Sequence, residues 1–412
     1  MASESPRTSA LQGLRVLDMT QYEAGTSCSQ ALAWLGADVV KVEPPGFGDP
    51  GRGGARGESN APYFINWNSN KRSIVLDLKQ PEGRQILLDM APHYDVFVEN
   101  YGPGVVEKLD IGYETMRQAN PSIIYAQLKG FGTSGPYSDY KCFDMVAQAT
   151  AGAFSVTGAA DGPPMRPGAT VGDSGTGVQL ALAITAAYVQ QLQTGEGQHI
   201  EISMQEAMTY YMRTQIAIGG DWGNAVAPRN GNGPTATTNL YPCAPADPSE
   251  TDGQPGPNDY VFVMCSRVHM WEAMARTMGR PELLADPRFE TLEARATNAD
   301  QLYEIVAEWT STKTKHEVMR ILGEGGVPVG KNFDTRDLFR DEHLNERGFV
   351  KELDHPEHGE IKVLGWAPRM SASAVPIERA PLFGEHSDEV LASDLGFGGD
   401  RLAELRAAGV VG

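Results

Sequence analysis

Strand-like and helix-like segments alternate along the first third of the chain, and this rhythm constrains the fold more than any other feature. The predicted strands are Leu14–Met19, Asp38–Glu43, Ser73–Leu78, Asp95–Val98 and Ile123–Leu128. Segments with helical spacing separate them at Thr26–Leu35, Pro81–Ala91 and Val105–Ala119, and the Gly-rich stretch 46–57, which includes Arg52, predicts a mobile surface loop. A helical crossover between two strands places them parallel in one sheet. The sequence therefore predicts an α/β fold, with helices on both faces of a parallel sheet.

The rhythm changes after Met212. Residues 219–258 are rich in Gly, Asn, Pro and Asp and show little periodicity. The predicted elements that follow are strand Tyr260–Met264, helices His269–Met278, Ala299–Trp309 and Thr314–Glu324, and strand Val327–Val329. This set is typical of a second, smaller α+β domain. The last predicted elements, after Leu338, are a hairpin over Val350–Trp366 and short helices around Glu389 and Leu402.

The charge of the chain narrows the classes of partner. It has 412 residues, a formal net charge of −19 and a pI near 4.9, which oppose binding to nucleic acid and to anionic membrane surfaces. An anionic ligand therefore needs a local cluster of Lys, Arg and backbone N–H groups. The longest apolar run, Ala181–Val189, is shorter than the ~20 residues of a membrane span, and polar residues 1–10 lack the apolar core of a signal peptide. We expect a soluble, cytoplasmic protein without a nucleic-acid or membrane partner.

Several cofactor signatures are missing from the sequence. It has no GxGxxG fingerprint after the first strand, no Walker A loop and no GxSxG elbow. The four cysteines are scattered without metal-ligand spacing, which fits free thiols in a reducing compartment. His355 and His358 lie close together, but the Pro and Gly beside them favour a turn over a metal site. We expect no metal and no permanently bound cofactor.

The run Gly172–Gly177 contains the strongest candidate for a catalytic group. It places Asp173 ahead of Val178–Gln190, a small and apolar stretch that predicts a buried helix. The unpaired N–H groups at a helix start favour negative charge. On that ground we expect Asp173 to be ionised at neutral pH and able to act as a nucleophile. An ordinary helix cap is the alternative interpretation, because Asp is a preferred N-cap residue.

A set of segments, in order along the chain, resembles the class III CoA-transferase family. The matching segments are 11–18, 35–43, 70–79, 98–104, 143–148, 157–158 with 162–164, Gly172–Asp173 and Ala380–His386. The resemblance implies a Rossmann-like large domain built from both chain ends, an inserted smaller α+β domain, and two chains interlocked in a homodimer. The domains are then a disordered N-terminus at 1–10, the large domain at 11–215, the small α+β domain with its linker at 216–335, and a C-terminal part at 336–412 that returns to the large domain.

The resemblance also implies an activity, the transfer of CoA from an acyl-CoA thioester to a free carboxylic acid. Asp173 would attack the thioester, giving an aspartyl-acyl anhydride and CoA thiolate. The thiolate would return to form an aspartyl-CoA thioester, which the acceptor carboxylate then attacks. Water must be excluded from the anhydride if the energy of the thioester is to be kept, and backbone N–H groups of a glycine-lined pocket would stabilise the oxyanions.

Further site residues follow from the matched segments. The CoA-binding residues that the resemblance implies are Glu23, Ala24, Leu76, Lys79, Asn100, Tyr101, Gly102, Lys108, Lys141 and Phe143. The three lysines among them would meet the phosphates of CoA, although each taken singly also fits a solvated surface residue. Asp144 aligns with an acidic residue near the family's nucleophile, and a helix-start cap is its alternative role.

Three departures from the oxalate-specific members of the family concern the acceptor acid. Those members carry a tryptophan where this chain has Gly54, and a tetraglycine loop where it has Asn230–Thr237, so Gly231 and Gly233 are candidate pocket residues. Glu23 stands where those members carry an amide. These changes predict a roomier pocket and an acceptor larger than oxalate. We expect a C4–C5 dicarboxylic acid such as malate, mesaconate, itaconate or succinate, with succinyl-CoA as a plausible donor.

Two other functions stay open. The α-methylacyl-CoA racemases of the same superfamily place a histidine base just before an aspartate, whereas the equivalent stretch here is Cys142-Phe143-Asp144, without an imidazole. A CoA-binding protein with an inactive site is the second alternative. The intact pair Gly172-Asp173 argues against it.

Overall fold

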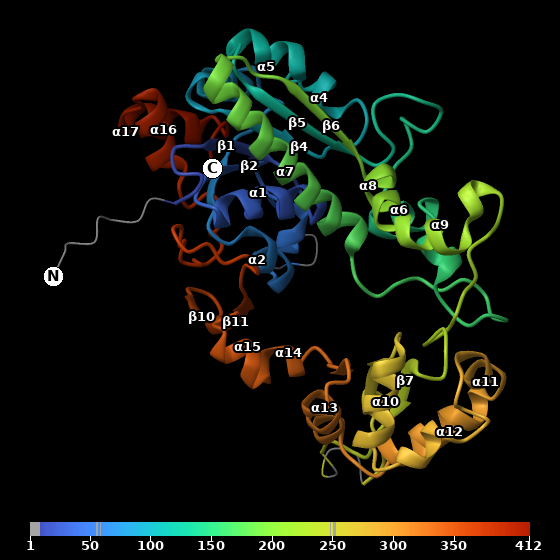
Figure 1. Cartoon of the computed structure of the whole chain (residues 1–412). Coiled ribbons are helices and arrows are strands. Elements are labelled where there is room, and N and C mark those ends of the chain that lie inside the picture. The colour runs from blue at the N-terminus through green and yellow to red at the C-terminus, as the bar shows by residue number, and fades with distance from the viewer. Residues whose placement is uncertain (1–8, 55–56, 58, 248, 250–252) are drawn as a thin grey trace. The chain divides into compact units, whose positions relative to one another are not determined.

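The computed structural model describes residues 9–54, 57, 59–247, 249 and 253–412, which form two compact units (Figure 1). The large unit comprises the chain up to Phe154, Arg166–Val226 and Glu346–Gly412. The small unit comprises Ser155–Met165 and Ala227–Asn345. The predicted domain boundaries stay predictions, and residues 1–8 of the predicted disordered terminus lie outside the described residues.

A six-stranded parallel sheet forms the centre of the large unit, as the rhythm of the sequence predicts. Its strand order is β3-β2-β1-β4-β5-β6, and every pairing is parallel. The strands are β1 (Arg15–Met19), β2 (Asp38–Glu43), β3 (Arg72–Val75), β4 (Val96–Glu99), β5 (Ile124–Lys129) and β6 (His199–Ser203). The chain adds β2 and β3 on one side of β1, then returns to add β4, β5 and β6 on the other side, so the strand order reverses between β1 and β4. In doubly wound sheets the loops beyond such a reversal leave a crevice in which ligands bind.

Helices cover both faces of this sheet, and the alternation of side chains along each strand explains how. Val16 and Leu17 are neighbours on β1 but belong to different cores, because successive strand residues point to opposite faces. The Leu17 face packs against α3, α5, α16 and α17, and the Val16 face packs against α1 and α7. The helices of the large unit are α1 (Ala24–Trp34), α2 (Pro62–Asn68), α3 (Pro81–Met90), α4 (Val105–Lys108), α5 (Tyr113–Ala119), α6 (Asp144–Thr150), α7 (Val171–Thr194), α8 (Met204–Tyr211), α9 (Arg213–Gly219), α16 (Ser387–Leu395) and α17 (Gly399–Ala407).

The end of the chain completes the large unit. Leu391 on α16 and Leu402 on α17 lie in the same core as α3, and Val411 forms an antiparallel bridge with Leu76 next to β3. The predicted hairpin is present as β10 (Val350–His355) and β11 (Gly359–Leu364), which pair antiparallel. Its turn is not fully solvated, because His355 is buried.

The small unit is a separate α+β structure with its own core. Its three-stranded antiparallel sheet has the order β7-β8-β9, and the core includes Trp271, Phe289 and Leu322. Its elements are β7 (Thr238–Pro242), β8 (Tyr260–Met264), α10 (Val268–Thr277), α11 (Leu292–Thr297), α12 (Ala299–Thr310), α13 (Lys315–Glu324), β9 (Val329–Lys331) and α14 (Asp337–Arg340), and α15 (Glu342–Glu346) leads back to the large unit.

Three local predictions were wrong. The single helix predicted at Val105–Ala119 is two helices, α4 and α5, because Asp110 adopts a left-handed backbone conformation with φ of 53°. The segment around Arg52 is not a surface loop: Pro50–Arg52 is a 3-10 helix, and the Arg52 side chain is 1% exposed. Helix α7 is not buried all round, since Leu182 on it is 72% exposed.

Some elements were not predicted. Strand β6 alternates apolar and polar residues, a strand signal, but it is a short edge strand beyond the regular rhythm. Strand β7 lies inside the stretch that shows little periodicity in sequence. None of the helices in the described ranges is both long and apolar enough to cross a membrane.

Candidate active site at the head of helix α7

Asp173 is the third residue of α7, so it lies in the first turn rather than ahead of the helix. Its backbone N–H donates a hydrogen bond of 3.0 Å to Oδ1 of Asp144, the first residue of α6. Oδ2 of Asp144 accepts from the Gln148 amide at 2.8 Å, and that amide also donates to the Ala169 carbonyl at 2.9 Å. Asp144 therefore caps α7 and fixes its start against α6. A side chain at Gly172 would place Cβ 2.8 Å from the Asp144 carbonyl oxygen, which explains the glycine before Asp173.

Glu23 belongs to the same site, although it is far away in sequence. It precedes α1, at the end of the loop after β1, and its side chain is buried with the residue 3% exposed. Thr170, the N-cap residue of α7, donates its hydroxyl to Glu23 Oε1 at 2.5 Å. The Tyr63 hydroxyl lies 3.4 Å from Glu23 Oε2.

The charges of Glu23 and Asp144 act on Asp173, and the charge of Asp144 also acts on Glu23. Burial, then the charges of Glu23 and Asp144, raises the pKa of Asp173 to about 7. Burial raises the pKa of Glu23 as well, and the charge of Asp144 adds to the effect. The sequence-based expectation took the pKa of Asp173 to be low, whereas burial and two like charges outweigh the field of the helix start and raise it.

A cavity of about 220 Å³ opens beside Asp173. The sequence-predicted residues that line it are Ala24, Asn100, Tyr101, Gly102, Lys141, Phe143 and Asp173. Cys142 also lines it, but burial and the Asp173 charge raise the pKa of its thiol to about 11. A thiol with so high a pKa is protonated at neutral pH and is a poor nucleophile.

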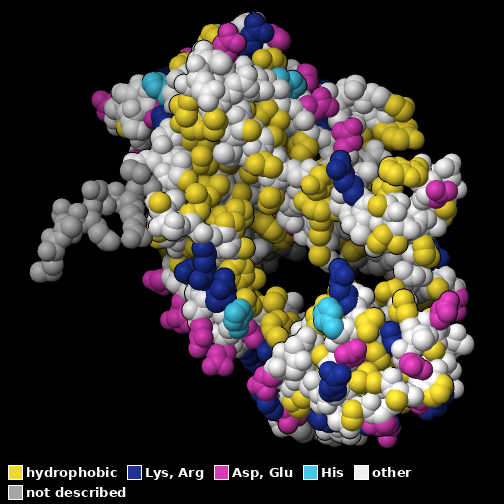
Figure 2. Space-filling model, viewed as in Figure 1, with side chains coloured by type: hydrophobic (Ala, Val, Ile, Leu, Met, Phe, Trp, Pro, Cys, Tyr) yellow, Lys and Arg dark blue, Asp and Glu magenta, His cyan; other side chains and the backbone are white. Residues whose placement is uncertain are grey.

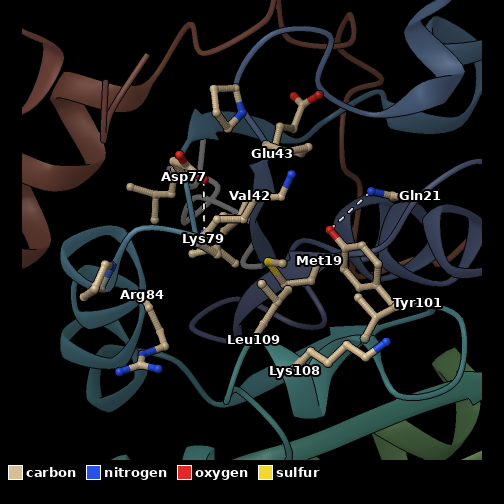
Figure 3. Close-up of a pocket in the computed structure, with 16 residues that line it drawn as sticks. Met19, Gln21, Val42, Glu43, Asp77, Lys79, Arg84, Tyr101, Lys108 and Leu109 are labelled. Carbon is tan, nitrogen blue, oxygen red and sulfur yellow. Dashed lines mark hydrogen bonds between the residues drawn. The ribbon is translucent and has the colours of Figure 1, made fainter. Parts of the chain in front are cut away.

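A larger cavity of about 720 Å³ lies beside the first (Figure 3). The sequence-predicted residues in its wall are Leu76, Lys79, Tyr101 and Lys108. Arg84 on α3 also lines it and was not predicted, because it stands inside a segment that shows only a helical pattern. One Arg84 nitrogen lies 3.3 Å from Asp110, while its buried Nε has no hydrogen-bond partner among the described residues. Three cationic side chains thus face this cavity.

Gln21 and Tyr101 connect the two cavities, since both residues line both of them. The Gln21 amide donates to the Tyr101 hydroxyl at 3.2 Å, as Figure 3 shows. Asn100 joins the same loops: its Oδ1 accepts from the Gln21 N–H at 2.8 Å, and its amide donates to the Gln21 carbonyl at 2.9 Å. These residues follow β1 and β4, so the cavities lie where the strand order reverses, which is where doubly wound sheets leave a crevice for ligands.

Buried ion pairs hold these loops in place. Lys129 lies 2.8 Å from Glu99, and the same two side chains bond the carbonyl and the N–H of Tyr101 at 2.6 and 2.7 Å. Lys41 pairs with Asp49 at 2.8 Å, and Asp49 Oδ1 accepts from the Tyr22 N–H at 3.1 Å. The Tyr22 backbone has φ of 61°, an unfavourable conformation for a bulky residue that these contacts stabilise.

The predicted pocket residues Gly231 and Gly233 belong to the small unit. The Gly231 N–H donates to the Gly158 carbonyl at 3.0 Å, within that unit. A side chain at Gly233 would place Cβ 2.2 Å from the Thr238 carbonyl oxygen, so this position needs glycine for packing. Their place beside the substrate stays a prediction. Of the predicted residues in the large unit, Glu23 and Asp144 line neither cavity and act through contacts at the head of α7.

Comparison with known proteins agrees with this geometry. A sequence model described as CoA-transferase family III matches residues 11–387. A formyl-CoA:oxalate CoA-transferase of Streptomyces coelicolor is 39% identical over 98% of this chain and 99% of its own, and one of Streptomyces avermitilis is 40% identical over 98% and 100%. The crystal structure of a CaiB/BaiF family protein from Brucella suis superposes with a TM-score of 0.81 at 28% identity, covering 94% of this chain and 99% of that protein.

Proposed function

The chain belongs to CoA-transferase family III and is a CoA-transferase, and from this premise we propose that Asp173 is the residue that carries the transferred groups. Its carboxylate attacks the acyl-CoA carbonyl, the C–S bond breaks, and CoA leaves as the thiolate. The thiolate then attacks the aspartyl carbonyl of the mixed anhydride, which releases the donor acid as its carboxylate. The acceptor carboxylate attacks the aspartyl-CoA thioester, the C–S bond breaks, and a second mixed anhydride forms as CoA leaves as the thiolate. The thiolate finally attacks the acceptor's acyl carbonyl, which forms the new acyl-CoA and releases the Asp173 carboxylate.

The position of Asp173 supports this proposal most directly. Among the described residues that line the 220 Å³ cavity, Asp173 is the only carboxylate. It reaches the cavity from the first turn of a helix, where backbone N–H groups stabilise negative charge that develops during the attack. The cavity wall is mostly apolar or neutral, which disfavours water near a reactive anhydride.

We propose that CoA occupies both cavities. Its nucleotide end fits the larger one, where Lys79, Arg84 and Lys108 supply local positive charge on a chain with a net charge of −19. The pantetheine arm then passes Gln21 and Tyr101, which line both cavities, and brings the thioester to Asp173. Glu23, a predicted CoA contact, is better placed to support Asp173 than to touch CoA, since its side chain bonds Thr170.

The proposed acceptor is a small dicarboxylate of four or five carbons. The relatives named formyl-CoA:oxalate CoA-transferase support a dicarboxylate. The larger size rests on Gly54, which leaves no side chain in the position where oxalate-specific members have a tryptophan. A Cβ at this position would lie 2.7 Å from the Phe47 side chain, so Phe47 occupies the space beside Gly54 and no larger residue fits there without a shift of Phe47.

We also propose a homodimer, and the surface of α7 supports it. Val178, Leu182, Val189 and Leu192 are 46%, 72%, 51% and 69% exposed. Figure 2 shows hydrophobic side chains gathered on the face that α7 crosses. Their spacing of three, four and seven residues places most of them along one side of the helix. A continuous apolar stripe on a surface helix is typical of a contact with another chain.

The mass of the intact protein after incubation with an acyl-CoA tests the proposed function. Formyl-CoA and succinyl-CoA serve as donors, each alone and with oxalate or a C4–C5 dicarboxylic acid. We expect a CoA adduct on Asp173 and turnover with the larger acids. In Asp173→Ala the adduct disappears and turnover falls by about 10³-fold or more. The exposed Asp161 provides the control, because Asp161→Ala removes a carboxylate that lines neither cavity.

Other outcomes of this experiment favour other functions. Oxalate as the preferred acceptor would contradict the proposed size of the pocket. Exchange of the α-proton in heavy water without any acceptor acid would favour a racemase. The lack of any adduct with a panel of acyl-CoAs would favour a CoA-binding protein without activity.

A further inference from the structure

At the head of α7, the charges of Glu23 and Asp144 oppose ionisation of Asp173. Asp173 must be ionised to attack a thioester, yet Glu23 and Asp144 act on it electrostatically, and the groups that shift its pKa include no cation. Within the described part of the chain, no Lys, Arg or His forms an ion pair with any of the three. Like charges in this partly buried site disfavour ionisation of Glu23 and Asp173 together, which favours a proton shared between these two groups.

N–H donors engage both oxygens of Asp144. Its Oδ1 accepts from the Asp173 N–H and its Oδ2 from the Gln148 amide. Amide N–H groups can only donate. These two hydrogen bonds hold the cap on α7.

Glu23 is well placed to hold a proton. Both oxygens of Glu23 face hydroxyl groups, Thr170 at 2.5 Å and Tyr63 at 3.4 Å. A hydroxyl can accept as well as donate. The hydrogen bond between Glu23 and Thr170 can therefore persist, with its direction reversed, when Glu23 is protonated. The same heavy-atom geometry serves both protonation states.

Resting on the proposed role of Asp173 as nucleophile, we propose that Glu23 holds the one proton of this cluster and thereby keeps Asp173 charged. Glu23 is a positioning residue in this scheme, since it acts through Asp173 and not on the substrate. A neutral Glu23 also adds no repulsion against the anionic acceptor acid. Tyr63 stays a neutral neighbour, because burial and the charges of Glu23, Asp173 and Asp49 raise the pKa of its phenol.

This arrangement gives the reaction two pH limits. At low pH, Asp173 is protonated and attack stops. At high pH, Glu23 loses its proton, and the added charge opposes both the nucleophile and the acceptor. The rate constant kcat/KM should therefore follow a bell-shaped curve whose two apparent pKa values belong to the coupled groups.

Glu23→Gln tests the proposal because glutamine is neutral at every pH and similar in shape. We expect the alkaline limb of kcat/KM to disappear and the acidic limb to move down by on the order of one pH unit, since the like charge beside Asp173 is gone. The CoA adduct on Asp173 should still form. A purely structural role for Glu23 would lower the rate and leave both limbs in place, and that result would overturn the inference.

Thr170 supplies a second test that does not depend on the folding of Glu23→Gln. The Thr170 hydroxyl donates to ionised Glu23 and thereby lowers the pKa of Glu23. Thr170→Val removes this hydroxyl, so the pKa of Glu23 should rise and the alkaline limb should move to higher pH. Thr170→Ser keeps a hydroxyl and should leave that limb where it is. Equal profiles for the two variants contradict the inference. An adduct that fails to form in the unmodified protein contradicts the proposed function itself, so the two failures are distinguishable.

Discussion

At the scale of single residues, the site combines reactivity with an energetic cost. Asp173 is held near two other carboxyl groups in a partly buried place, which raises its pKa to about 7. A raised pKa makes a carboxylate more basic and a better nucleophile, but its charged form is disfavoured in the folded state. Functional groups of this kind are placed where they reduce stability, and the surrounding contacts offset the loss.

Asp173→Asn should therefore stabilise the protein in a pH-dependent way. The pKa of Asp173 rises from 3.8 to about 7 on folding, so between these pH values the folded state binds more protons than the unfolded state. Stability then falls as pH increases from about 4 to about 7 in the native protein but not in the variant. We expect the Tm of the variant to equal that of the native protein near pH 4 and to exceed it by a few degrees at pH 8. This difference corresponds to about 2–4 kcal/mol in the free energy of unfolding.

Thermal unfolding across pH 4–8 measures this difference. Asp161→Asn, at an exposed position, is the control and should show no trend with pH. A Tm difference that is constant or that shrinks with rising pH would show that the Asp173 pKa is not raised.

The residues also show how far the sequence can predict a site. Asp173 could be singled out from its motif and from its place at a helix start. Its charge state could not be predicted, because Glu23, Thr170 and Asp144 come from separate segments that meet only in the folded chain. Arg84 was missed for a related reason, since nothing local distinguishes a helix arginine that faces a cavity from one that faces solvent.

At the scale of elements, the crossing of α1 and α7 sets the geometry of the site. Gly177 makes the crossing close: a Cβ there would lie 2.1 Å from Ser27 Oγ and 2.4 Å from the Ala24 carbonyl oxygen. The backbone atoms of α1 cannot yield to a new methyl group without moving the helix. Because Ala24 and Asp173 line the same cavity from these two helices, any shift changes the site.

Gly177→Ala should lower both stability and activity. We expect a loss of about 1–3 kcal/mol in the free energy of unfolding, from overpacking, and at least a tenfold loss of kcat/KM, from displacement of Asp173 relative to the thioester. Gly323 on α13 is a matched control, because a Cβ there meets no atom within 4 Å. Gly323→Ala should be neutral or slightly stabilising, by about 0.5–1 kcal/mol. Urea denaturation and steady-state kinetics measure both; unchanged kinetics in Gly177→Ala would show that the crossing does not position the site.

Prediction of the elements succeeded where the local pattern decides the structure. The bounds of β2 and β8 are those expected, because apolar runs flanked by breakers leave little choice. The break between α4 and α5 was missed, because it depends on the left-handed backbone of Asp110, a conformation that is uncommon for a non-glycine residue. The exposed face of α7 was missed because its apolar residues imply burial. In the single chain these residues are exposed to solvent.

At the scale of the whole molecule, that uncovered face is the main argument for a second copy of the chain. A net charge of −19 repels like chains, so association needs a large apolar contribution. The stripe on α7 offers one, and an interlocked dimer, which the family resemblance implies, would leave little stable folded monomer. Folding and association would then be one process.

Leu182→Glu should disrupt this dimer. In the native protein we expect a mass of two 44.5 kDa chains by sedimentation, and a Tm that rises with protein concentration because unfolding is coupled to dissociation. The variant removes about 1.5–3 kcal/mol of apolar burial per chain and adds a charge that would have to be desolvated. It should therefore sediment as monomer or as unfolded chain at micromolar concentration. Leu292→Glu is the control, since Leu292 on α11 is exposed to nearly the same extent, 70% against 72%, and lies on the small unit away from α7 in sequence. A native protein that sediments as one chain, or a Leu182→Glu variant that remains dimeric with an unchanged Tm, would show that the stripe on α7 is not the interface.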